Sequence, residues 1–158
     1  MTLRWPAWLK FGEEQPFKPE KTVWLCYENP VWVATLRRHL SPDVRLRRAP
    51  NLQFVREKFA SGLPSFAIYE WQPAELEDFL SLTHSLKGHL SAMPLVVLLN
   101  RATIAQEITF RALGVMHVVL TPQKVPELAK IVDRYFESLP RWSWPESELA
   151  PIPLPWRE

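Results

Sequence analysis

The stretch FAIYEWQPAEL, residues 66–76, contains the end of one predicted strand and the start of a predicted helix. Its first four residues form an apolar run with the length of a short buried strand, and Glu70 ends that run. Pro73 then suits the first turn of a helix. Parallel α/β domains repeat this strand-to-helix unit and bind their ligands at the carboxyl ends of the strands. Glu70 therefore occupies a position where such domains often place their chemistry.

The same unit occurs five times between residues 22 and 139. Each copy begins with a predicted strand and continues with apolar residues at helical spacing. The five predicted strands span residues 22–28, 44–49, 65–70, 95–100 and 115–120. Four of them are mostly apolar, whereas VRLRRA alternates apolar and basic residues, as an edge strand does. The pattern predicts an α/β fold: a five-stranded parallel sheet of order 2-1-3-4-5 with helices on both faces, forming three layers.

Capping residues mark several of the predicted helix ends. Asn29 and Asn51 each precede a helical pattern and are predicted N-caps, and Gly114 suits the C-terminal end of the fourth helix. The third helix, after Pro73, has its apolar side chains at helical spacing, which predicts a buried face. That face consists of Leu76, Phe79, Leu80 and Leu86. The predicted face of the last helix consists of Leu128, Ile131, Val132, Tyr135 and Phe136.

The flanking regions differ in composition from this central domain of residues 22–139. We interpret residues 1–21 as an N-terminal arm and residues 140–158 as a C-terminal tail. The tail contains five of the 16 prolines and three of the eight tryptophans of the chain. Proline-rich segments with exposed aromatic residues often bind partners, and the candidates are Trp142, Trp144 and Trp156. The alternative is that the tail folds back on its own domain, over Trp5 and Trp8.

Composition excludes several classes of function. The chain has 158 residues, a net charge of +2 and a single cysteine, so an intrachain disulfide and a cysteine-based metal site are both excluded. We expect Cys26 to be a small buried residue. The apolar stretches of the chain reach about half the length of a membrane span, and the N-terminus lacks a signal-peptide core. These features predict a cytoplasmic protein without a membrane contact.

The predicted strand ends lack the motifs of common active sites. There is no glycine-rich phosphate loop, and no histidine accompanies a serine or cysteine at a strand end. We therefore predict no enzymatic activity, no cofactor and no dedicated metal site. Glu28 and Glu70 would meet at adjacent strand ends, where two carboxylates can bind Mg²⁺ weakly. The alternative is that both are solvated, paired with Arg101 or Lys124.

Residues 22–139 resemble the receiver domain of response regulators. The order and spacing of the elements match, and four segments match locally: YENPVWVATLRRHL, FAIYEWQP, MPLVVLLN and ALGVMHVVLTP. The resemblance implies that Tyr27 and Glu28 stand where the family has two Mg²⁺-binding acids. It also implies that Glu70 stands in place of the phosphoryl-accepting aspartate. Pro122 is retained, and by analogy the Thr121–Pro122 peptide bond would be cis.

Three further positions depart from the family pattern. Leu99 replaces the hydroxyl residue that contacts the phosphoryl group, Val118 replaces the aromatic switch residue, and Thr121 replaces the lysine. Phosphoryl transfer needs Mg²⁺ and a cation near the equatorial oxygens, and leucine cannot donate a hydrogen bond. We therefore predict a degenerate receiver, or pseudo-receiver, that is not phosphorylated and acts through protein contacts in a signalling or regulatory assembly. An atypical phospho-receiver that uses Glu70 is the lesser alternative.

Two surfaces remain as candidates for partner binding. The resemblance implies pairing through residues 102–139, with a protein partner or a second copy, and the candidate side chains are Arg111, Lys130 and Arg134. Residues 37–58 contain a basic patch that could attract nucleic acid, as an alternative function. It consists of Arg37, Arg38, Arg45, Arg47, Arg48, Arg56 and Lys58. No aromatic residue is predicted to lie among these cations for base stacking, so nucleic acid is a disfavoured partner.

Overall fold

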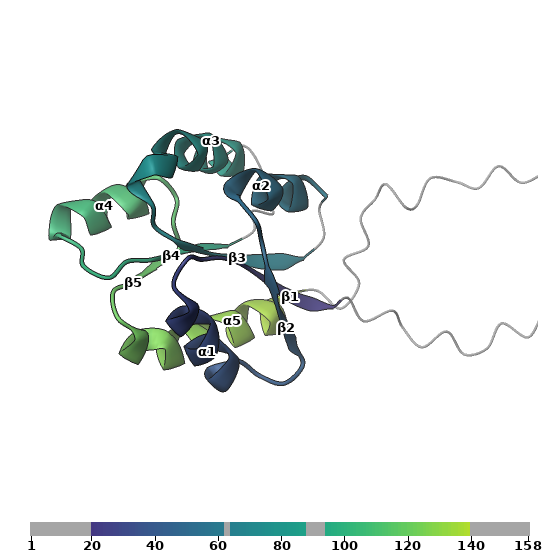
Figure 1. Cartoon of the computed structure of the whole chain (residues 1–158). Coiled ribbons are helices and arrows are strands. Elements are labelled where there is room, and N and C mark those ends of the chain that lie inside the picture. Colours follow the sequence, from purple (N-terminus) through teal and green to yellow (C-terminus); the bar gives the residue numbers. More distant parts are fainter. Residues whose placement is uncertain (1–19, 62–63, 88–93, 140–158) are drawn as a thin grey trace, which may run out of the picture.

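The computed structural model describes residues 20–61, 64–87 and 94–139, which form a three-layer α/β domain (Figure 1). Its five strands are parallel and follow the order β2-β1-β3-β4-β5, which confirms the predicted topology. The strands are β1 Lys21–Cys26, β2 Val44–Arg48, β3 Ser65–Glu70, β4 Leu95–Leu98 and β5 His117–Val119. Because β1 begins at Lys21, this residue belongs to the sheet and not to the predicted arm. Glu20 of the predicted arm is also described, whereas residues 1–19 and the whole C-terminal tail lie outside the described residues.

Helices cover both faces of the sheet. One face carries α1 Pro30–His39 and α5 Val125–Ser138, and the other carries α2 Leu52–Ala60, α3 Leu76–Lys87 and α4 Ile104–Ala112 (Figure 1). Two short 3₁₀ helices, η2 Pro73–Glu75 and η3 Pro122–Lys124, precede α3 and α5. The two layers have separate cores, because successive side chains of a buried strand point to opposite faces. All six side chains of β3 are buried, as expected for the central strand.

The predicted caps are confirmed at three helix ends. The Asn29 side chain accepts a hydrogen bond from the Val31 N–H, and the Asn51 side chain accepts one from the Phe54 N–H. Each side chain thereby satisfies a backbone donor that the first helical turn leaves without a partner. After α4 the chain turns at Gly114, whose φ of +96° favours glycine. Local sequence signals thus set where these elements begin and end.

The predicted buried face of α3 is partly wrong. Phe79 and Leu86 are buried as expected, but Leu76 and Leu80 are 46% and 41% exposed. Leu82 and Thr83 are buried in their place. The physical reason is the orientation of the helix: Phe79 is at the centre of the buried stripe, and with about 100° of rotation per residue Leu80 lies well to one side of it. The buried set then follows a spacing of three, four and seven residues from Phe79.

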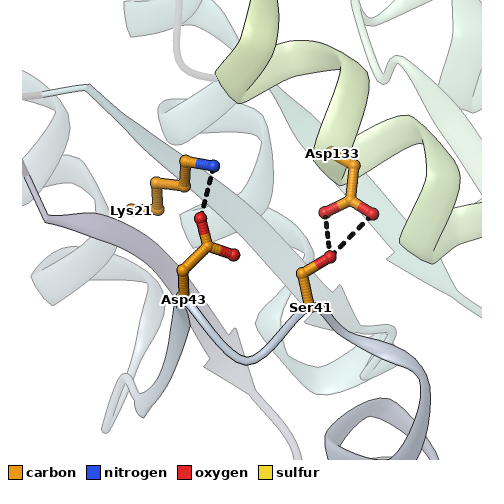
Figure 2. A network of polar contacts seen from close by, with 4 residues as sticks. All are labelled: Lys21, Ser41, Asp43 and Asp133. Carbon is orange, nitrogen blue, oxygen red and sulfur yellow. Dashed lines mark hydrogen bonds and ion pairs between the residues drawn. The ribbon is translucent and has the colours of Figure 1, made fainter.

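A polar network joins the first strand to the last helix at the amino end of the sheet (Figure 2). Lys21 Nζ lies 2.6 Å from Asp43 Oδ2. The Ser41 hydroxyl donates to the carboxylate of Asp133, whose two oxygens lie 2.8 and 2.9 Å from Oγ. Ser41 and Asp43 both belong to the loop between α1 and β2, so this loop links β1 to α5. Among the described residues, no helix combines the length and apolar character needed to cross a membrane.

Candidate functional site

The carboxyl ends of β1, β3, β4 and β5 bring the predicted site residues to one edge of the sheet. Glu70 ends β3, the central strand, and the loop that carries Tyr27 and Glu28 follows β1. Leu99 and Thr121 follow β4 and β5. Their placement at this edge follows from the parallel topology, since parallel strands all end on the same side. The contacts of each side chain then decide what the edge can do.

The Glu70 carboxylate is bound to the backbone of the loop after β1. It is 8% exposed, and its Oε2 atom accepts hydrogen bonds from the N–H groups of Glu28 (2.7 Å) and Asn29 (2.9 Å). Both bonds are charge-assisted, and Asn29 is the N-cap of α1, where the helix dipole favours a negative charge. Glu70 therefore fastens the start of α1 to the end of β3.

The side chain of Glu28, the other predicted acid, does not bind the Glu70 carboxylate. Glu28 is exposed, and it is its backbone N–H that contacts Glu70. The Tyr27 ring is partly buried and lies under the Arg48 guanidinium, 5.2 Å from carbon to ring centroid. In the parts of the chain that the structure describes, no group of three or more His, Cys, Asp or Glu side chains could hold a metal ion.

Leu99 and Val118 are core residues. Each is 6% exposed, and both belong to the apolar cluster on the side of the sheet that α2, α3 and α4 cover. The Leu99 N–H donates to the Val119 carbonyl at 2.8 Å, which extends the ladder between β4 and β5. Neither side chain has a polar atom. Packing, and not hydrogen bonding, is therefore what these two positions contribute.

The predicted cis bond before Pro122 is wrong, because the described residues contain no cis peptide bond. Thr121 has an extended backbone, and Pro122 begins the 3₁₀ turn, where the Lys124 N–H donates to the Thr121 carbonyl at 3.0 Å. Proline with a trans bond fits the first position of a helical turn, and trans is the lower-energy form by about 0.5–1 kcal/mol. Thr121 itself is exposed.

Sequence reasoning missed an aromatic cluster beside Glu70. The rings of Tyr69, Trp71, Phe79 and Phe110 pack against one another with centroid distances of 5.0–6.3 Å. The Tyr69 hydroxyl donates to Glu75 Oε2 at 2.7 Å, and burial together with this bond raises the pKa of Tyr69.

Burial, followed by the charge of Glu75, raises the pKa of the Cys26 thiol to about 12. Cys26 is 6% exposed and is therefore a small core residue, as predicted.

The surface of residues 102–139 is more apolar on α4 than the sequence suggested. Ile104 and Ile108 are 79% and 62% exposed, and Phe110 is the buried residue of this helix. Arg111, one of the predicted contact residues, is paired with Glu107 at 2.9 Å. The other two predicted contact residues, Lys130 and Arg134, are exposed on α5. The spacing of the two isoleucines, one helical turn apart, was the available signal for a solvent-facing apolar stripe.

The predicted basic patch is divided between the two faces of the sheet. Arg37 and Arg38 lie on α1, whereas Arg56 and Lys58 lie on α2, which covers the opposite face. The arginines of β2 are also divided between the two faces. Arg48 contacts Tyr27. Arg45 and Arg47 alternate along the strand with Val44 and Leu46, whose side chains pack toward α1. The expected lack of aromatic neighbours is wrong as well. Lys58 Nζ lies 5.3 Å from the Trp24 ring centroid and 5.1 Å from that of Phe54.

Several response regulators are among the solved structures that share this architecture. The chain is similar to a putative response regulator from Chloroflexus aurantiacus J-10-fl, with 18% identity and a TM-score of 0.55 over 73% of this chain and 98% of that one. It is also similar to an orphan response regulator of H. pylori, with 14% identity and a TM-score of 0.58 over 75% and 98% of the two chains. A response regulator from Thermotoga maritima gives 18% identity and a TM-score of 0.57 over 75% and 98%.

These likenesses define the fold of the described domain. The domain is a parallel α/β sandwich in which all strands end at one edge of the sheet. More specifically, it has the CheY-like fold of response-regulator receiver domains. No family model matches the chain, and no curated protein matches it either. Because these identities are below 20%, the similarity establishes the fold and not the chemistry of the site.

Proposed function

We propose that this protein is a pseudo-receiver: a non-catalytic, cytoplasmic receiver-like domain that is not phosphorylated and acts through protein contacts in a signalling or regulatory assembly. The observation that carries the proposal is the pair of hydrogen bonds from the backbone of Glu28 and Asn29 to Glu70. A carboxylate that accepts a phosphoryl group must present an oxygen as a nucleophile. Here the carboxylate is buried and holds a helix start in place.

The surroundings of Glu70 support the same proposal. The Tyr27 side chain packs with Arg48, and Leu99 is buried without a polar atom, so neither helps to bind a metal or a phosphoryl oxygen. Thr121 is neutral at the position where the resemblance implies a lysine. Since phosphoryl transfer depends on cations that offset the charge of the transferred group, the neutral side chain at Thr121 argues against the reaction.

The contact surface that we propose is the face built by α4, β5 and α5, within residues 102–139. Ile104 and Ile108 form its apolar centre, and Arg111 with Glu107 lies beside them. Fully burying an isoleucine contributes about 1.5–3 kcal/mol, so two of them can anchor a modest interface. The occupant is a protein partner or a second copy of this chain.

Titration with Mg²⁺ and beryllium fluoride, a phosphoryl mimic, tests the proposal directly. Backbone amide chemical shifts are followed by NMR at Glu28, Glu70, Leu99 and Thr121. We expect no saturable shift at millimolar Mg²⁺, because Glu70 Oε2 is bonded to the backbone of Glu28 and Asn29 and the described residues contain no group of three or more His, Cys, Asp or Glu that could hold the ion. Saturable shifts at Glu28 and Glu70 that spread to Leu99 and Val118 would instead establish a working phospho-receiver.

A further inference from the structure

The strand β2 has an open edge. Among the described residues, Val44–Arg48 pairs with β1 on one side and with no strand on the other. The outer backbone groups of such a strand can pair with an added strand, which is a common way of binding extended peptides. The side chains that flank this edge determine which kind of segment could bind as the added strand.

Arg45 and Arg47 make the edge a carboxylate-binding surface. They are two residues apart and lie on the same face of β2, with side chains that are 70% and 53% exposed. A carboxylate already lies between them: Glu20 Oε2 is 3.0 Å from Arg47 Nη2, and Glu20 Oε1 is 3.5 Å from Arg45 Nε. Glu20 directly precedes β1 and would compete with any acidic ligand for this pair.

Apolar surface and a third cation lie next to the arginine pair. Trp24 of β1 stands opposite Arg47 in the sheet register, and its ring meets that of Phe54 edge-on at 5.0 Å. Both aromatic side chains are partly exposed, and the Lys58 ammonium lies over them. These groups lie on the same face of the sheet as Arg45 and Arg47, one strand further in than the arginine pair.

We propose that the β2 edge binds an acidic polypeptide segment as a sixth strand. Carboxylates at alternate positions of the segment face Arg45 and Arg47, and its backbone pairs with β2. The spacing favours a peptide, because side chains two apart on a strand match arginines two apart on its neighbour. A second copy is a poor occupant through this edge, since its own β2 is equally basic and like charges in opposite positions repel.

The first test uses two fluorescein-labelled peptides with the same charge, each with Ser-Gly at both ends. One contains Glu-Val-Glu-Val-Glu-Val, which can form a strand, and the other contains Glu-Pro-Glu-Pro-Glu-Pro, which lacks the alternate N–H donors. Binding to the full chain is measured by fluorescence anisotropy at about 0.1 M salt, where distant charges are largely screened. We expect the valine peptide to bind at least about tenfold more tightly. Amide hydrogen exchange of Val44–Arg48 should slow when it is bound.

Matched variants locate the site. Replacing both Arg45→Glu and Arg47→Glu should weaken binding of the valine peptide by about tenfold or more. The same change of charge at Arg37→Glu and Arg38→Glu, on α1, should alter the affinity by less than about threefold. Glu20→Gln should tighten binding about two- to fivefold, because it removes the internal competitor. Thermal unfolding checks each variant, and Arg45→Gln with Arg47→Gln replaces the first pair if it does not fold.

Three outcomes would overturn the proposal. Equal weakening by the two double variants would mean that charge attracts the peptide without a defined site. Equal binding of the valine and proline peptides would mean that no strand is added. Tighter binding of a single-stranded dT15 oligonucleotide, lost in the Arg45→Glu and Arg47→Glu variant, would assign the surface to nucleic acid, with Trp24 and Phe54 as stacking partners.

Discussion

At the end of β3, one carboxylate holds two elements together. Glu70 is long enough to reach the N–H groups of both Glu28 and Asn29, at 2.7 and 2.9 Å. These donors lie at the start of α1, where the helix itself offers them no acceptor. At the scale of the residue, Glu70 therefore has a structural role that accounts for its burial.

Replacing Glu70→Gln tests this role. The amide keeps the size of the side chain but loses the negative charge, so we expect the free energy of unfolding to fall by about 1–3 kcal/mol. Glu28→Gln is the matched control: the same chemical change at an exposed side chain should alter it by less than about 0.5 kcal/mol. Urea unfolding of the three proteins measures both effects. Equal losses in the two variants would argue against the tie between β3 and α1.

At the scale of the element, α4 is the helix with the most exposed large apolar side chains among the described residues. Its two exposed isoleucines are one turn apart, and we expect them to be covered in an assembly. If the occupant is a second copy, sedimentation velocity should detect a dimer whose population rises with concentration. Ile104→Gln with Ile108→Gln should weaken it at least about tenfold and leave the thermal stability nearly unchanged.

The same change on α3 provides the control for α4. Leu76→Gln with Leu80→Gln also removes two exposed apolar side chains, which are 46% and 41% exposed, but from a different helix. This variant should associate like the native protein. A native protein that remains monomeric up to high concentration would exclude the second copy and leave a different protein as the occupant of α4.

How far the sequence determines these elements depends on the kind of signal. Asn29 and Asn51 mark helix starts because their side chains bond the adjacent backbone, so a local pattern was sufficient. The buried face of α3 is centred on Phe79, and its apolar pattern, which also includes Leu76 and Leu80, does not show which side of the helix packs on the sheet. The bond of Glu70 was also hidden, because its donors are backbone groups more than 40 residues away along the chain.

At the scale of the whole molecule, the two ends of the domain are joined through one loop. The loop between α1 and β2 contacts β1 through Asp43, which pairs with Lys21, and contacts α5 through Ser41, which donates to Asp133 (Figure 2). The two links differ in their exposure to solvent. Ser41 and Asp133 are partly buried, whereas the Asp43 side chain is 50% exposed and that of Lys21 is 23% exposed.

This difference predicts which link stabilises the fold more. A double-mutant cycle with Ser41→Ala and Asp133→Asn should give a coupling free energy of about 1–2 kcal/mol, because a charged acceptor that is partly withdrawn from water strengthens its bond. The cycle with Lys21→Gln and Asp43→Asn should give about 0.2–1 kcal/mol, and most of that should vanish in 1 M salt. Urea unfolding measures both cycles. If the Lys21–Asp43 coupling were the larger and did not depend on salt, the ion pair, and not the Ser41 hydroxyl, would be the stronger of the two links that this loop makes.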